Sequence, residues 1–80
     1  MLPDRDGQVR IRANVAGAVE IRASVGQVIV FGQILAIVEG DQEIESLSVR
    51  HTSEVLEILV ADGAEVPAGT TLMVVRETDD

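Results

Sequence analysis

The sequence predicts an all-β domain: a flattened β-barrel or sandwich built from two quasi-symmetric four-stranded halves. Apolar residues make up 46% of the chain and lie mostly in short runs that alternate with polar residues, a period typical of strands. Turns containing glycine separate these runs, and the same order of turns and apolar residues occurs twice. A chain of 80 residues has room for one core. We therefore expect one domain at residues 8–76, between flexible ends at 1–7 and 77–80.

The first half is predicted to contain the strands that lead up to a central turn. Residues 9–15 and 19–23 alternate between apolar and polar side chains, which predicts strands with one buried and one solvated face. The short apolar run at 28–30 predicts a further strand. Residues 34–38 are all apolar, which predicts a strand covered on both faces.

The second half follows a turn signal at residues 40–41, which places a hairpin between the two halves. Residues 43–49, 54–60 and 70–76 predict its strands. Because one half alone has too few strands to bury its apolar face, we expect the two halves to pack face to face. This symmetry places the hairpin at one end of the molecule and the chain termini at the other.

Four glycines mark the repeat. Gly63 follows Gly26 by 37 residues (63 − 26), and Gly69 follows Gly32 by the same interval. The apolar pairs that keep this offset are Ile29 and Val66, Leu35 and Leu72, and Val38 and Val75. We interpret the four glycines as structural, at positions that need a positive φ or a close approach of strands.

The composition excludes several classes of function. Fourteen acidic residues against six basic ones, all arginine, give a net charge of −8, and the chain has no lysine, cysteine, tryptophan or tyrosine. Nucleic-acid partners are not expected, because affinity for phosphates comes mainly from clustered cations. The absence of cysteine excludes disulfides and thiol chemistry. The apolar segment 25–38 is too short and too interrupted to cross a bilayer, and residues 1–7 lack the apolar stretch of a secretory signal, so we expect a cytoplasmic protein without a membrane partner.

The pattern Gly-x-x-Ile-x-x-Gly-Gln-x-Leu-Ala-x-x-Glu at residues 26–39 resembles the biotinyl/lipoyl carrier domain family, which includes biotin carboxyl carrier domains. Residues 57–72 are similar to the second half of these domains, and residues 13–17 are similar to their small-residue opening. The resemblance covers most of residues 9–76. It implies the two-halved β fold and a lysine in the central hairpin that carries biotin or lipoate. It also implies protein partners such as carboxylase or acyl-transfer enzyme subunits.

In the family, the attachment lysine follows the glutamate of this pattern by three residues, and here that position is Gln42. Val55 follows Glu39 by 16 residues (55 − 39), the spacing of a typical biotinyl domain, so no gap is needed. A primary amide nitrogen is not nucleophilic and cannot be acylated. We therefore expect no cofactor; biotin or lipoate would be expected only if residue 42 were lysine. The domain is expected to be a non-catalytic interaction or structural module. The expected interaction face is Glu39, Asp41, Gln42, Glu43 and Glu45.

Two alternatives remain. The chain could be the carrier subunit of a biotin-dependent carboxylase or acyl-transfer complex, seen as a Lys-to-Gln variant. It could instead be the lipoyl-like domain of a membrane-fusion adaptor, because residues 11–17 also resemble the opening of such domains, although that family inserts a helical hairpin between the halves.

An enzyme is not expected. Asp41, Glu43 and Glu45 are interpreted as a solvated acidic edge rather than as a metal or acid–base site. His51 is interpreted as a surface residue, because no nucleophile elbow or oxyanion signature surrounds the nearby serines. Phe31, the single aromatic residue, is expected to pack in the core or in a turn.

Overall fold

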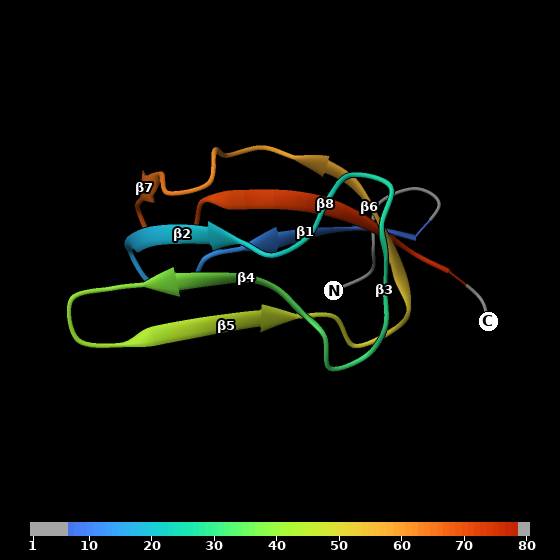
Figure 1. The fold of residues 1–80 in the computed structure, drawn as a ribbon, viewed down its shortest axis with the longest axis horizontal. Helices are drawn as coiled ribbons and strands as arrows, with labels where there is room; N and C mark the ends of the chain where they lie inside the picture. Colours follow the sequence, from blue (N-terminus) through green and yellow to red (C-terminus); the bar gives the residue numbers. More distant parts are fainter. Residues whose placement is uncertain (1–6, 79–80) are drawn as a thin grey trace.

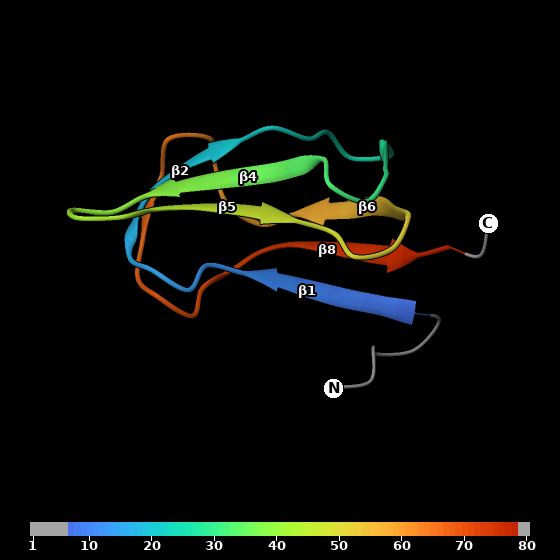
Figure 2. The same ribbon diagram turned by 90° about the horizontal axis from the view of Figure 1, so that it is seen from below.

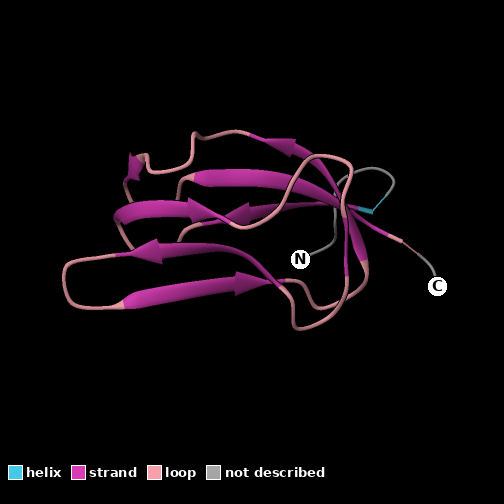
Figure 3. Cartoon of the chain, in the orientation of Figure 1, coloured by secondary structure: helices cyan, strands magenta, loops and turns pink. Residues whose placement is uncertain are grey.

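The computed structural model describes residues 7–78 and contains eight strands joined by turns and loops (Figures 1 and 3). The strands are β1 (Gln8–Arg12), β2 (Gly17–Ile21), β3 (Val28–Ile29), β4 (Ile34–Glu39), β5 (Ile44–Ser48), β6 (Ser53–Ile58), β7 (Glu65–Val66) and β8 (Thr71–Glu77). Residues 7–78 consist almost entirely of strands, turns and loops. That part of the chain accordingly contains no helix with the length and hydropathy needed to cross a membrane.

The strands form two antiparallel four-stranded sheets, in the orders β1-β8-β6-β3 and β5-β4-β2-β7. Strands β1 to β4 of the first half are equivalent to strands β5 to β8 of the second. Replacing each strand of one sheet by its equivalent gives the order of the other sheet, so the internal repeat relates the two sheets. Each sheet takes its two central strands from one half and its two edge strands from the other. The halves therefore interlock, and neither forms a separate layer as the face-to-face expectation implied.

The two sheets form a sandwich, which confirms the predicted fold, and they do not close into a barrel (Figure 2). Within the described residues, the outer strands β1, β3, β5 and β7 each pair on one side only. Two of them, β3 and β7, contain only two residues each. Because the two sheets pack against each other through one face each, the other face of each sheet is directed toward solvent.

The four repeat glycines adopt nearly the same backbone conformation. Their φ angles are 89° and 87° at Gly26 and Gly63, and 90° and 92° at Gly32 and Gly69. A Cβ built at any of them meets no atom within 4 Å. Glycine is therefore favoured here by the positive φ of each turn and not by close packing.

The repeat extends to the hydrogen bonds and to the core. The Val55 N–H donates to the Gln27 carbonyl at 2.9 Å, and the Val19 N–H donates to the Ala64 carbonyl at 2.9 Å. Between the sheets, the buried pairs at equivalent positions are Val19 and Val55, Ile29 and Val66, Leu35 and Leu72, and Val38 and Val75. Phe31 is not part of this core, because its turn leaves it 75% exposed.

The apolar run of β4 is not covered on both faces, contrary to the prediction from its continuous hydrophobicity. Ile37 pairs with Glu20 of β2 and Ser46 of β5 and is only half-buried on the outer face of the sheet. Ile34, at the start of the strand, is 42% exposed. An open sandwich buries only the inner face of each sheet, so the outward residues of β4 reach solvent.

The hairpin between β4 and β5 projects from one end of the sandwich, while β1 begins and β8 ends at the opposite end, as the symmetry predicts (Figures 1 and 2). There Gln8 pairs with Arg76. Strand β8 continues through Glu77, and the Thr78 N–H donates to the Thr52 carbonyl at 2.9 Å. The rest of the predicted flexible ends, residues 1–6 and 79–80, lies outside the described residues.

Candidate functional site

The β4–β5 hairpin is the most projecting part of the described chain. Glu39 pairs with Ile44, and the Gly40 N–H donates to the Glu43 carbonyl at 2.8 Å, which closes the loop 40–43. Asp41, Gln42 and Glu43, the hairpin tip, all have exposed side chains. A partner protein can therefore contact the tip without displacing other parts of the domain.

The base of the hairpin lies directly against the backbone at the start of β2. A Cβ at Gly17 would overlap the Glu39 carbonyl and lie 2.8 Å from the Gly40 nitrogen. A Cβ at Gly40 would lie 2.8 Å from the Ala16 carbonyl oxygen. Only glycine fits this close approach without moving backbone. The sequence indicated Gly17 as part of a family-like opening but gave no sign that it contacts the hairpin.

Asn14, in the turn between β1 and β2, holds the first part of β5. Its backbone N–H donates to Glu45 Oε1 at 2.8 Å, and its side-chain Nδ2 donates to Glu45 Oε2. Together these bonds attach the start of β5 to the connection between β1 and β2. Sequence reasoning did not identify Asn14, because the two residues are 31 positions apart and no local pattern links them.

The structure brings together three of the five residues of the expected interaction face, namely those of the hairpin tip. Glu39 is exposed on the outer face of the β5-β4-β2-β7 sheet, where it pairs with Ala18 of β2. Glu45 pairs with the fully buried Val38 and so points from the inner side of the sheet toward Asn14. The five residues therefore do not form one surface.

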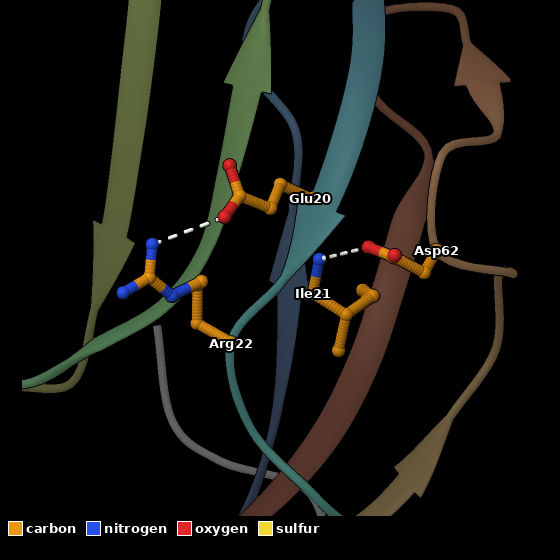
Figure 4. A network of polar contacts seen from close by, with 4 residues as sticks. All are labelled: Glu20, Ile21, Arg22 and Asp62. Carbon is orange, nitrogen blue, oxygen red and sulfur yellow. Dashed lines mark hydrogen bonds and ion pairs between the residues drawn. The ribbon is translucent and has the colours of Figure 1, made fainter.

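A hollow of about 480 Å³ lies beside the hairpin on the outer face of the same sheet. It is lined by Ala18, Val19, Glu20, Ile37, Glu39, Ile44, Asp62 and Gly63. Two of its acids already have partners: Arg22 Nη1 lies 3.0 Å from Glu20 Oε2, and Asp62 Oδ1 accepts the Ile21 N–H at 2.8 Å (Figure 4). The hollow combines an apolar floor with an acidic rim.

The other candidates provide no catalytic arrangement. His51 is exposed, and the nearby Ser53 hydroxyl donates to the His51 backbone carbonyl at 2.7 Å rather than to the imidazole. In the described part of the chain, no three His, Asp or Glu side chains are grouped closely enough to hold a metal ion. The site offers contact surface and charge but no nucleophile paired with a base.

Comparisons with known proteins give both a family and a fold. The model of the biotin/lipoyl family, described as "Biotin-requiring enzyme", matches residues 8–75. No curated protein matches the chain. A single-chain, multi-domain long-chain acyl-CoA carboxylase superposes with a TM-score of 0.83 at 26% identity, over 99% of this chain and 8% of that one.

Two further solved structures share the fold. Urea carboxylase from Kluyveromyces lactis has a TM-score of 0.75 at 22% identity, over 94% of this chain and 6% of that one. A putative succinylglutamate desuccinylase/aspartoacylase from Shewanella frigidimarina has a TM-score of 0.74 at 24% identity, over 91% of this chain and 21% of that one. The chain therefore spans less than a quarter of the length of each of these three proteins.

The family match begins in β1, ends in β8 and includes the whole hairpin. It covers both halves of the sequence repeat, which the sheet order shows to interlock. On these grounds the chain belongs to the biotin/lipoyl family of carrier domains.

Proposed function

We propose that this domain is a non-catalytic protein interaction module, in which Gln42 stands where carrier domains of the family have their attachment lysine. The observation that carries the proposal is chemical. The exposed hairpin tip contains two carboxylates and one carboxamide, and the whole sequence contains no lysine. The only amine of the chain is its α-amino group.

Covalently held biotin or lipoate does not fit these residues. The tip is accessible enough for a tethered group, but attachment forms an amide between an activated acyl group and an amine. The nitrogen of the Gln42 carboxamide is not nucleophilic, because its lone pair is delocalised into the carbonyl. We therefore assign no step of acyl or carboxyl transfer to this chain.

The hairpin is suited to recognition without a prosthetic group. Its base is fixed by the Gly17–Gly40 contact and by the bonds from Asn14 to Glu45, so a bound partner meets a preorganised loop. The tip carries negative charge on an acidic domain, which favours partners with a basic surface. Carboxylase or acyl-transfer subunits are proposed partners, because carrier domains present this hairpin to such enzymes.

A second candidate is a carrier domain of a carboxylase in which glutamine replaces the lysine of a parent sequence. The superposition on the acyl-CoA carboxylase at 26% identity favours this possibility. The membrane-fusion adaptor is less well supported, because the short loop 40–43 joins β4 and β5 and leaves no room for an inserted helical hairpin. The occurrence of the fold in a protein named as a desuccinylase/aspartoacylase supports a use of the domain outside carboxylases.

Intact-mass spectrometry tests the proposal. The 80-residue protein is incubated with biotin or lipoate, ATP and the corresponding ligase, beside the variants Gln42→Lys and Glu43→Lys. We expect no mass gain for the wild type, one acyl group on Gln42→Lys, and none on Glu43→Lys, where the amine is one residue out of place. Acylation of the wild type away from its α-amino group would refute the proposal. A folded Gln42→Lys variant that is not acylated would show that residue 42 is not the attachment position.

The interaction role is tested separately by affinity capture with purified carboxylase and acyl-transfer subunits. A variant with alanine at Asp41, Gln42 and Glu43 serves as the comparison. We expect at least one subunit to bind the wild-type protein and the same subunit not to bind the variant. Equal binding by both proteins would exclude the hairpin tip as the interaction site.

A further inference from the structure

The internal repeat makes the outer faces of the two sheets directly comparable. On the β1-β8-β6-β3 sheet, cross-strand neighbours balance their charges. Glu54 pairs with Arg76, and Arg10 and Glu57 lie on either side of Val74. Glu54 and Arg76 lie opposite one another on adjacent strands, a placement that favours opposite charges, and Arg10 and Glu57 add one charge of each sign to the same face.

The equivalent face of the β5-β4-β2-β7 sheet lacks this balance. Glu39 takes the place of Arg76 (76 − 39 = 37), and its cross-strand neighbours are Ala18 and Ile44. Among the described residues, the ion pair on this face joins Glu20 to Arg22, and no basic side chain contacts the Glu39 carboxylate. The fold itself does not require this composition, since the equivalent positions of the other sheet, Glu54 and Arg76, carry opposite charges.

The unbalanced face is also hollow and apolar. Ile37 takes the place of Val74, and together with Ala18 and Ile44 it contributes to the hollow of about 480 Å³. Ile44 is 65% exposed, so an aliphatic side chain meets solvent directly beside the free carboxylate of Glu39. An apolar floor next to an acid is complementary to a side chain that has an aliphatic stem and a cationic head.

Figure 4 shows the two other acids of the hollow, Glu20 and Asp62. Glu20 points toward Arg22, and Asp62 points toward the Ile21 N–H, so the other two carboxylates of the hollow are already engaged. Strand β5 is an edge strand, so its outer backbone groups are also open to an extended segment. The net charge of −8 further favours a cationic partner over another acidic one.

We propose that this Glu39 face, formed by Ala18, Ile37, Glu39 and Ile44, docks a basic, extended segment of a partner protein. An arginine or lysine of that segment pairs with Glu39, its aliphatic stem lies over Ile37 and Ile44, and flanking aliphatic residues fill the hollow. The inference rests on the proposed role in protein interaction. The docking surface is the outer face of the sheet, whereas the proposed function places the protein contact at the hairpin tip.

Chemical-shift mapping on the ¹⁵N-labelled 80-residue protein tests the docking. The probe is the peptide acetyl-Val-Arg-Val-Arg-Val-amide, and its control replaces both arginines with glutamate. We expect the arginine peptide to shift amides of β2, β4 and β5 and to bind more weakly as salt is raised. The glutamate peptide should leave these amides unchanged. Shifts confined to the loop 40–43, or equal shifts with both peptides, would overturn the inference.

Matched variants separate a local contact from the overall charge. Glu39→Gln and Glu57→Gln change the net charge equally but lie on opposite sheets. We expect about threefold weaker binding of the arginine peptide to Glu39→Gln, as for an exposed ion pair, and unchanged binding to Glu57→Gln. Ile44→Ser should weaken binding by a similar factor. Equal losses in both charge variants would refute the docking, as would self-association of the peptide-free protein through this face.

These outcomes are independent of the attachment test. A wild-type protein that accepts biotin in the ligase assay would remove the proposed function whatever the peptide does. A wild-type protein that resists acylation but shows no shifts on β2, β4 and β5 would leave the proposed function in place and refute the docking surface.

Discussion

Replacing Gly17 with alanine is expected to destabilise the domain through a backbone clash at the base of the hairpin. The added Cβ would lie 2.6 Å from the carbonyl carbon of Glu39 and 2.8 Å from the nitrogen of Gly40. Ordinary contacts of a Cβ begin near 3.4 Å, so the end of β4 must move away from β2 by several tenths of an ångström or more. Both neighbours are backbone atoms, which cannot relax by a change of rotamer.

The loss of stability in Gly17→Ala can be estimated from the backbone movement that the added Cβ requires. Forcing extra atoms into a packed site costs about 1–3 kcal/mol, and the absence of a flexible neighbour places Gly17→Ala near 3 kcal/mol. Gly63→Ala is the matched control, because its Cβ meets nothing within 4 Å and only the positive φ of 87° opposes it. That strain alone costs about 1 kcal/mol. For a domain of this size, the melting temperature should fall by about 15 °C for Gly17→Ala and about 5 °C for Gly63→Ala.

Thermal unfolding is best followed by far-ultraviolet circular dichroism or calorimetry, because the chain lacks tryptophan and tyrosine. Amide spectra of the Gly17→Ala protein should also show displaced signals at Glu39 and Gly40. Equal losses of melting temperature for Gly17→Ala and Gly63→Ala would refute the close approach. A stable Gly17→Ala protein with an unchanged hairpin spectrum would refute it as well.

Four other substitutions test three separate parts of the structure. Gln42→Lys should change the free energy of unfolding by less than about 0.5 kcal/mol, because the side chain is exposed, and a loss of cooperative unfolding would contradict that position. Gly32→Val should cost about 2 kcal/mol, since a β-branched residue is strained at φ 90°, and an unchanged melting temperature would disprove the turn. Asn14→Ala removes the Nδ2 donor to Glu45 and should cost roughly 0.5–1 kcal/mol. Glu45→Gln should then add less in the Asn14→Ala background than alone, and strictly additive losses in a double-mutant cycle would argue against the pairing.

The position of the hairpin tip followed from local information. The apolar run at 34–38 and the turn residues Gly40 and Asp41 indicate a reversal of the chain at this point. The spacing of the family pattern then predicts that Gln42 stands at the position of the attachment lysine. The orientation of Glu45 could not be inferred in this way, because it depends on Asn14, a residue of another strand connection.

The Glu39 face was also beyond sequence reasoning. A continuous apolar strand suggests burial on both sides, and Ile37 was expected to be covered for this reason. Whether a second layer lies over the outer face depends on how many elements the fold has, and this fold has only two sheets. The comparison of Glu39 with Arg76 requires both the offset of the repeat and the register of strands that are distant in sequence.

The sequence by itself determined the strand content, the turns with positive φ, the duplicated halves and the absence of an amine at residue 42. These properties depend on single residues and short-range periodicity, and the chain carries them before it folds. Only the tertiary structure decided that the halves interlock into an open sandwich, that Gly17 supports the hairpin, and that Glu39 lies beside an apolar floor without a basic partner among the described residues. Those features depend on which strands become neighbours, and strand pairing joins residues whose separation along the chain leaves no local signal.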